Sequence, residues 1–389
     1  MQICICRIRV EYVNLKDICK INMGQSPDST SYNSDKQGVP FYQGNADFGA
    51  LYPKPRIWCN KPIKLAKEND ILISVRAPVG ALNFSKEECC IGRGLASITL
   101  DSNDFLLEFI YWSLRTGVKE LQNKSTGSTF KSINKKTLEE VRIPKVPLKE
   151  QKDIIRNLTL LTNILAKYKH EIVFLDELVK ARFVEMFGDP RINEKKWKAG
   201  KIVDYFEVKG GKRIPKGMGY AERKTNHPYL RASDMKNATI LDDDIHYIDE
   251  EVYKRIKRYT VNAHDIYLTN VGVNLGMAGV IPKQYDGANL TENAVKLVPK
   301  DKILLNGMFL SYYINSPGIQ HYINERKMSV GVPKLAIFRI ESMPLLLPPL
   351  ELQNQFASFV EEVDKSRLRE LLAIKQIKLL LNDSWLLFY

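Results

Sequence analysis

The same series of short motifs occurs twice along this chain, in the same order. Residues 15–27 (LKDICKINMGQSP) resemble residues 202–215 (IVDYFEVKGGKRIP), and Gly24 matches Gly211 at an offset of 187 residues. The offset grows to 202 residues where VPLKEQ aligns with PPLELQ. The later pairs are residues 39–47 with 227–234, 69–75 with 264–271, 109–117 with 309–318, and 146–151 with 348–353. Five matches in one order predict a duplicated chain whose loops differ in length between the copies.

Each copy begins with a mixed region of strands and helices. The runs 71–75, 96–100 and 265–269 are short, apolar and bounded by Gly, Pro or Asn, which is typical of strands. Helices are predicted for residues 104–116 and 308–316. Both copies therefore contain an α/β region of similar design.

A long helix is predicted at the end of each copy. Apolar residues at a spacing of three and four follow Pro147 and stop before Gly188, and a shift of 202 residues places a second stripe after Pro349. Arg367 and Glu370 interrupt this second stripe. The predicted seam contains Ile154, Leu158, Leu161, Leu165, Tyr168, Ile172, Leu175, Val179 and Met186 in the first helix, with Arg182 in one place, and Val360, Val363, Ile374, Ile377 and Leu381 in the second.

A helix of about 40 residues is about 60 Å long, and its apolar stripe needs a partner in water. The helix of the other copy is the natural partner, in an antiparallel pair with one domain near each end. The alternative is two independent helices, each covering its own domain. The predicted fold class is thus α+β, with two similar α/β domains separated by two long helices packed as an antiparallel coiled coil. The predicted boundaries are 1–147 for the first domain, 148–187 for the first helix, 188–197 for a linker, 198–349 for the second domain and 350–389 for the second helix.

The charge of the chain favours a polyanionic partner. The 389 residues carry 58 Lys and Arg against 45 Asp and Glu, a formal net charge of +13. Such a surplus suits double-stranded DNA, although it also serves solubility or attraction to anionic lipid. Forked donors and amides suit base edges, whereas Lys and hydroxyl groups suit phosphate. The residues predicted to contact DNA are Gln43, Asn45, Arg76, Arg93, Lys124, Ser128, Thr129 and Lys131 in copy one, and Arg231, Asn270, Asn274, Arg326, Lys327 and Lys334 in copy two.

Common catalytic motifs are missing from the sequence. No P-loop and no G-x-G-x-x-G occurs, and the Pro-Pro pair at 348–349 marks a helix start rather than the loop of an amino-methyltransferase. A nuclease would have to use Glu150 with Lys152 or Glu194 with Lys196. The six cysteines form no C-x-x-C and the histidines are scattered, so neither a metal site nor a catalytic residue is predicted. Without a run of 18 apolar residues or a convincing signal peptide, a cytoplasmic protein is expected.

The motifs ILISVRAPVGALNF (71–84), CCIGRGLASI (89–98) and STGSTFKSINKKTLEEVRIPKVPLKEQ (125–151) together resemble the specificity (S) subunit of type I restriction–modification systems. The second copy ends in the related PPLELQNQF (348–356). The resemblance implies two target recognition domains that each read half of a split DNA target. It also implies that the helices dock two methyltransferase (M) subunits, and that restriction (R) subunits join them. S-adenosylmethionine would bind to the M subunits, and ATP and Mg to the R subunits. The S subunit itself would carry no cofactor and no catalytic residue.

Two departures and three alternatives accompany this resemblance. SVGVPKLAI (329–337) replaces GSTFKSI in copy two, and Leu352 stands where copy one has Glu150. The first alternative is a stand-alone DNA-binding regulator with no M partner. A monomeric methyltransferase would bind S-adenosylmethionine by itself, and a purely structural coiled-coil protein would show no affinity for DNA that falls with salt. Under the S-subunit hypothesis, the expected target is split and asymmetric, with half-sites about one turn of DNA, roughly 10 base pairs, apart.

Overall fold

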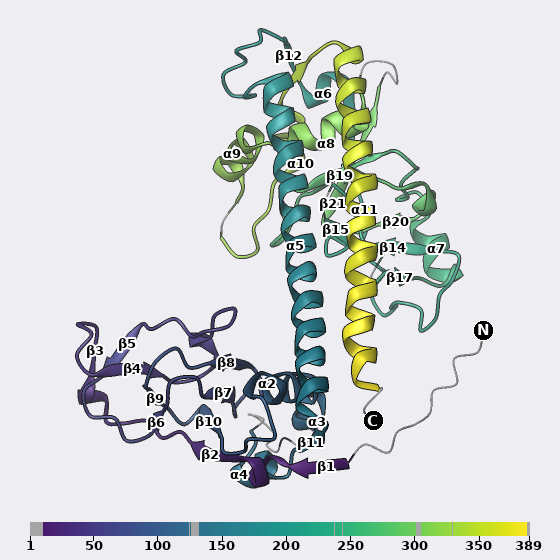
Figure 1. Cartoon of the computed structure of the whole chain (residues 1–389). Coiled ribbons are helices and arrows are strands. Elements are labelled where there is room, and N and C mark those ends of the chain that lie inside the picture. The colour runs from purple at the N-terminus through teal and green to yellow at the C-terminus, as the bar shows by residue number, and fades with distance from the viewer. Residues whose placement is uncertain are drawn as a thin grey trace. The chain divides into compact units, whose positions relative to one another are not determined.

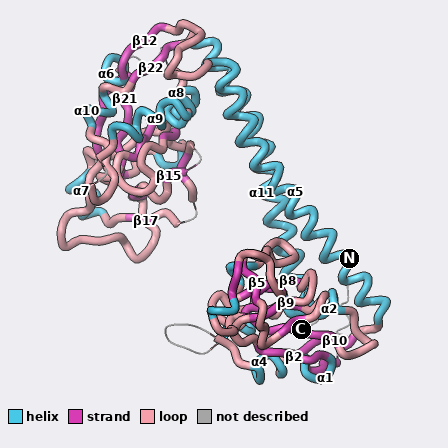
Figure 2. The backbone as a smooth tube through the Cα atoms, turned by 90° about the vertical axis from the view of Figure 1, so that its left-hand side faces the viewer, coloured by secondary structure: helices cyan, strands magenta, loops and turns pink. Residues whose placement is uncertain are grey.

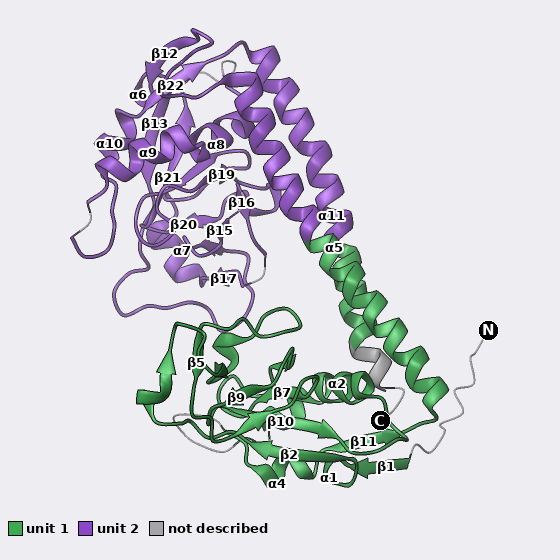
Figure 3. Cartoon of the chain, turned by 60° about the vertical axis from the view of Figure 1, so that its left-hand side comes forward, with its two compact units in different colours: residues 1–169, 372–389 green, residues 170–371 purple. Residues whose placement is uncertain are grey.

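The structure is a computed structural model, and it describes residues 11–123, 125, 132–236, 238–242, 244–300, 305–328 and 330–386, with side chains to residue 381. The chain forms two compact units (Figure 3). Unit 1 comprises Met1–Lys169 and Leu372–Tyr389, and unit 2 comprises His170–Leu371. The division falls within both long helices, so each unit contains a stretch of the helix pair.

Unit 1 is built on small sheets that carry short helices. Strand β1 (Glu11–Asn14) pairs with β11 (Arg142–Lys145), and a second sheet has the order β2-β10-β7-β8. A third sheet, β3-β5-β4-β9-β6, contains a parallel pair formed by β4 and β9. The remaining bounds are α1 (Leu15–Ile18), β2 (Cys19–Met23), β3 (Tyr32–Asn33), β4 (Val39–Tyr42), β5 (Ile57–Cys59), β6 (Leu65–Ala66), β7 (Ile71–Ser74), β8 (Leu82–Phe84), β9 (Cys89–Ile91), β10 (Leu95–Leu100), α2 (Leu107–Thr116), α3 (Val118–Asn123) and α4 (Lys135–Glu139) (Figure 1).

Unit 2 repeats this plan (Figure 2). Strand β12 pairs with β22, a sheet of order β13-β21-β18-β19 follows, and β14 and β20 form the parallel pair beside β17. Strands β15 and β16 form a separate hairpin. The bounds are β12 (Lys198–Lys201), α6 (Ile202–Tyr205), β13 (Phe206–Gly210), β14 (Pro228–Leu230), β15 (Met235–Lys236), β16 (Thr239–Ile240), β17 (His246–Tyr247), α7 (Glu250–Ile256), β18 (Ile266–Thr269), β19 (Ala278–Val280), β20 (Asn289–Leu290), β21 (Ala294–Pro299), α8 (Gly307–Asn315), α9 (Pro317–Arg326), α10 (Ile337–Glu341) and β22 (Pro344–Leu347).

Residues that match between the copies make equivalent contacts in both units. The carboxylates of Asp17 and Asp204 accept the backbone N–H of Asn14 (3.2 Å) and Lys201 (2.7 Å), which caps α1 and α6. A Cβ at Gly24 would lie 2.2 Å from the carbonyl oxygen of Gly92, and the same close approach occurs at Gly211. Only glycine lets the backbones pass so closely. The predicted α+β duplication is confirmed by this topology.

The long helices are α5 (Leu148–Phe187) and α11 (Leu350–Leu386). Each begins with a fully buried glutamine, Gln151 or Gln353. The Gln151 side chain accepts the N–H of Leu106 (2.8 Å), and that of Gln353 accepts the N–H of Asn306 (2.8 Å). The matched VPLKEQ and PPLELQ motifs therefore tie each helix start to the loop before α2 or α8.

The two helices run antiparallel, as predicted. Within unit 2, Phe356 near the start of α11 packs on Phe183 and Phe187 near the end of α5, with ring centroids 5.4 and 5.6 Å apart. Farther along, Arg367 of α11 pairs with Asp176 of α5. Within unit 1, Leu158 is buried in a core that Leu381 contacts. The structure buries Leu158, Val179, Val360, Val363, Ile374 and Ile377, and half-buries Ile154, Leu161, Leu165, Tyr168, Ile172, Leu175, Met186 and Leu381.

At Arg367, one of the two polar positions that interrupt the seam, ion pairs balance the charge. Arg367 forms ion pairs with Asp176 on α5 and with Asp364 one turn away on α11.

Among the helices of the described chain, none is long and apolar enough to cross a membrane.

Candidate nucleic-acid interface

A small basic hollow gathers four of the residues predicted to contact DNA. Gln43, Asn45, Arg76 and Arg93 line a cavity of about 180 Å³ in unit 1, together with Ser26, Gly44, Ala77 and Gly94. We call it the first hollow. Its residues come from four separate parts of the sequence, so the fold rather than local sequence brings them together.

The parallel pair of β4 and β9 explains this convergence. Parallel strands end at the same edge of a sheet, and Gln43 directly follows β4 while Arg93 lies just after β9. The N–H of Val75, at the end of β7, donates to the carbonyl of Gly94 (2.9 Å), which brings Arg76 to the same edge. A Cβ at Gly94 would lie 2.3 Å from the carbonyl oxygen of Gln43, so glycine is required where these loops meet.

Asp47 holds the loop that carries Gln43 and Asn45. Its carboxylate accepts the backbone N–H of Gln43 (2.8 Å) and pairs with Arg56. The positive charge of Arg56 therefore balances the negative charge of this carboxylate.

The first hollow keeps a positive charge. Arg76 and Arg93 are exposed, and neither forms an ion pair within the described part of the chain. Two guanidinium groups and two amides thus offer hydrogen-bond donors to an anionic or base-edge ligand.

The remaining residues predicted in copy one lie outside the described residues. These are Lys124, Ser128, Thr129 and Lys131. The described chain resumes at Ser132, whose backbone pairs with Arg76 at the rim of the first hollow.

An equivalent hollow of about 480 Å³ occupies the same place in unit 2. We call it the second hollow. It lies beside the parallel pair β14 and β20, and the residues that line it include Arg213, Tyr220, Tyr229, Arg231, Thr291, Glu292 and Asn293. Of the residues predicted in copy two, only Arg231 lines it.

Arg231 is held by acidic neighbours. Its guanidinium contacts Asp234 (2.7 Å), Asp244 (3.0 Å) and His246 (3.2 Å), and its side chain is 21% exposed. The side-chain hydrogen bond to Asp234 is the main reason that the pKa of Arg231 is raised. Arg231 therefore braces the loop between β14 and β17, and its forked donors are occupied.

Two of the predicted asparagines serve the fold. Asn270 is only 6% exposed, because its backbone is bonded on both sides to Asn293 and Leu335. Asn274 donates its side-chain amide to the carbonyl of Ala232 (3.1 Å). The structure therefore argues against direct base contact by Asn270, and it gives Asn274 a loop-holding contact instead.

Arg326 and Lys327, the predicted basic residues near the end of α9, do not line the second hollow. Arg326 stacks over the ring of Tyr322 (4.0 Å) and pairs with Glu325, and it lines a different depression with Arg191. Lys327 donates to the side chain of Asn324 (2.7 Å). Lys334 is exposed, and its backbone pairs with Val271 and Met328.

The second hollow also contains Arg213, Tyr220 and Glu292, which were not predicted from the sequence. The signal was available, because extending the match of Gly24 with Gly211 by two residues places Arg213 opposite Ser26 of the first hollow.

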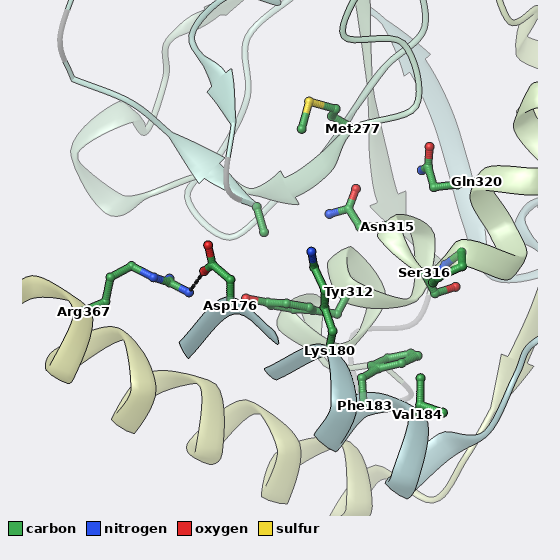
Figure 4. Close-up of a pocket in the computed structure, with 12 residues that line it drawn as sticks. Asp176, Lys180, Phe183, Val184, Met277, Tyr312, Asn315, Ser316, Gln320 and Arg367 are labelled. Carbon is green, nitrogen blue, oxygen red and sulfur yellow. Dashed lines mark hydrogen bonds and ion pairs between the residues drawn. The ribbon is translucent and has the colours of Figure 1, made fainter. Parts of the chain in front are cut away.

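Another hollow of unit 2 shows no catalytic arrangement among its described residues (Figure 4). It measures about 570 Å³ and lies where α5 meets α8 and α9, with Phe183, Val184 and Tyr312 in its lining. Its charged members are Lys180 and the Arg367–Asp176 pair. In the described part of the chain, no three His, Cys, Asp or Glu residues are grouped to hold a metal ion.

Cysteine and acid–lysine chemistry also lack support. Burial raises the pKa of Cys19 and Cys89 to about 12, so both remain thiols at neutral pH. Glu150 and Lys152 lie two residues apart on α5, where side chains face different directions.

Comparison with known proteins decides the family. The model described as "Type I restriction modification DNA specificity domain" matches residues 8–173 and again residues 194–379. The chain belongs to this family of type I restriction–modification specificity subunits. The two matched ranges follow the duplication seen in the sequence and in the two units.

Individual relatives show how widely the family varies. The type I restriction enzyme MjaX specificity subunit of Methanocaldococcus jannaschii is 45% identical over 146 residues, which cover 38% of this chain and 34% of that protein. The MjaIX specificity subunit of the same organism is 22% identical over 81% of this chain and 76% of its own length. The crystal structure of an S subunit from M. genitalium matches 98% of this chain and 96% of its own, with a TM-score of 0.57 and 16% identity, and so supports the fold alone.

Proposed function

We propose that this chain is the DNA sequence-specificity subunit of a type I restriction–modification complex, and that each unit reads one half of a bipartite DNA target. The observation that carries the proposal is the recurrence of the same hollow, beside the same parallel strand pair, in both copies of a duplicated fold. The first hollow supplies unpaired forked donors and amides, which are the groups that read base edges in the major groove.

The long helices are proposed to dock M subunits, and R subunits would join this assembly. The S-adenosylmethionine needed for adenine methylation would bind to the M subunits, and ATP and Mg would bind to the R subunits. The chain itself would select the DNA and would catalyse neither methylation nor cleavage. Methylation requires the adenine to leave the base stack, and the M subunit would receive it. The complex would act in the cytoplasm.

Methylation-sensitive long-read sequencing tests the proposal directly. The full chain is co-expressed with its cognate M subunit in a host that lacks other adenine methylation. We expect one methylated motif made of two short specified blocks separated by unspecified bases. A continuous motif, or methylation that does not change when this chain is omitted, would refute the proposal. Specific DNA binding by the chain without any complex with M would favour a stand-alone regulator.

A further inference from the structure

The two hollows place the same pair of backbone positions against each other. In both units the strand that follows α1 or α6 runs beside the turn that follows the parallel strand pair. Three backbone N–H to carbonyl bonds in unit 1 have a counterpart in unit 2. In unit 1 they run from Gly24 to Leu95, from Gln25 to Ile91 and from Gly92 to Tyr42. In unit 2 the corresponding bonds run from Gly211 to Ala294, from Lys212 to Leu290 and from Thr291 to Leu230. Ser26 is therefore equivalent to Arg213, and Arg93 is equivalent to Glu292.

Both hollows carry an arginine at this pair of positions, but on opposite members of the pair. In unit 1 the arginine is Arg93, whose backbone N–H donates to the Ser26 hydroxyl (3.3 Å). In unit 2 it is Arg213, whose Nε donates to Oε1 of Glu292 (2.5 Å). Both units therefore have a contact between these two positions, but the arginine stands at one position in unit 1 and at the other position in unit 2.

The geometry of Arg213 leaves its fork accessible. Its side chain is 78% exposed, whereas that of Glu292 is 29% exposed. Within the described residues, Nε of Arg213 donates its hydrogen bond to Glu292, and the two terminal nitrogens of the guanidinium make no hydrogen bond. Those terminal nitrogens are the atoms that reach guanine O6 and N7 in the major groove.

Glu292 is fixed by its own neighbours. Its second carboxylate oxygen accepts hydrogen bonds from the hydroxyls of Thr291 (3.2 Å) and Tyr229 (3.4 Å). Burial acts to raise the pKa of Glu292, but the hydrogen bond from Arg213 and further contacts outweigh it and hold the pKa below its usual value. The carboxylate is thus ionised at neutral pH. A guanidinium held through Nε loses less freedom when its fork binds a ligand.

We propose that Arg213 is a guanine-reading residue for the second half-site, that Glu292 positions it, and that Arg93 holds the corresponding reading position for the first half-site. This inference rests on the proposed function. It replaces Arg231, whose nitrogens are engaged by Asp234 and Asp244, as the base-reading arginine of unit 2.

Selection from a randomised duplex library tests the inference. The full chain, co-purified with its M subunit, is compared with Arg213→Gln, Arg213→Lys and Glu292→Gln, and the bound sequences are determined. Arg213→Gln is expected to lose roughly 10- to 100-fold of the preference for G·C at one position of the second block. Arg213→Lys should lose part of this preference while the salt dependence of binding is retained, because the charge stays and the planar fork is lost. Glu292→Gln should weaken the preference at that position alone.

A second arginine–glutamate pair provides the matched control. Arg255 and Glu251 lie on α7 of the same unit, 2.7 Å apart and with side chains 57% and 68% exposed, away from the second hollow. Arg255→Gln should leave the selected motif unchanged. The inference fails if Arg213→Gln keeps the complete motif, or if it weakens binding to all sequences equally, as loss of a phosphate contact or of a simple surface ion pair would. If the unaltered chain selects no motif, the proposed function itself fails.

Discussion

The two hollows have the same frame but a different arrangement of charge. Asp47 and Asp234 are matched residues, and each carboxylate accepts the backbone N–H of the residue that follows its strand, Gln43 or Arg231, at 2.8 Å. In unit 1 the positive partner of this carboxylate is Arg56, which lies nine residues further along the same connection between β4 and β5. In unit 2 it is Arg231 itself. Equivalent positions therefore differ in role, since Gln43 is exposed and available whereas Arg231 is a brace.

This difference shows which features a duplicated fold can change freely. Matching backbone hydrogen bonds, and the close backbone approach at Gly24 and Gly211, recur in both units. The identity of each side chain that fills the frame is free, provided that any buried charge finds a partner. Two halves of one chain can thereby read different base sequences through one architecture.

Arg231→Gln should produce the largest effect, and it should act on stability. The variant leaves Asp234, whose side chain is 4% exposed, without its cation. Removing one partner of a buried pair costs about 3 kcal/mol. We expect the free energy of unfolding to fall by about that amount in urea denaturation. Gln43→Ala at the equivalent exposed position of unit 1 should change it by no more than about 0.5 kcal/mol. Equal losses of unfolding free energy in the two variants would contradict the distinction between Arg231, which holds its loop, and Gln43, which is exposed.

Arg76→Gln should have a smaller effect, and it should act on binding. Arg76 has no ion pair among the described residues, so its positive charge is available to DNA phosphate. We expect roughly 10-fold weaker binding and a salt dependence reduced by about one unit of slope, with stability unchanged. Arg156→Gln is the control, because Arg156 is an exposed arginine of α5 that already pairs with Asp153. An unchanged salt slope for Arg76→Gln would place the DNA elsewhere.

Much of the fold was predictable because it depends on regular patterns. The repeat, the helix periodicity and the polar interruption at Arg367 are periodic or local, and the sequence contains them. In the first hollow, Gln43, Arg76 and Arg93 could be named from the sequence, since each polar residue follows a strand, but their convergence was not predicted. The surroundings of Arg231 in the second hollow could not be predicted because its contacts depend on tertiary structure. Asp244, which engages Arg231, lies 13 residues along the chain.

The burial of Asn270 and the role of Arg213 show two different limits. Nothing in the residues around Asn270 distinguishes it from an exposed loop asparagine, because its burial comes from pairing with Asn293 and Leu335. Arg213, in contrast, was within reach of the repeat alignment. Comparing the copies residue by residue, rather than collecting basic residues from loops, would have placed it opposite Ser26.

The smallest predicted effect concerns the helix pair of unit 2, where Glu370 of α11 lies beside Glu171 of α5. Burial and, second, the negative charge of Glu171 raise the pKa of Glu370 above its ordinary value of 4.5. Because the folded state binds this proton more tightly than the unfolded chain does, the contribution of Glu370 to the free energy of unfolding should become more favourable as pH falls from 7 toward 4.5. Glu370→Gln should be slightly more stable than the unaltered chain at pH 7, and the difference should disappear as Glu370 becomes protonated. Glu177→Gln, at an exposed position of α5, should show no such pH-dependent gain in thermal denaturation. A gain from Glu370→Gln that is independent of pH would mean that helix propensity, and not the carboxylate pair, is responsible.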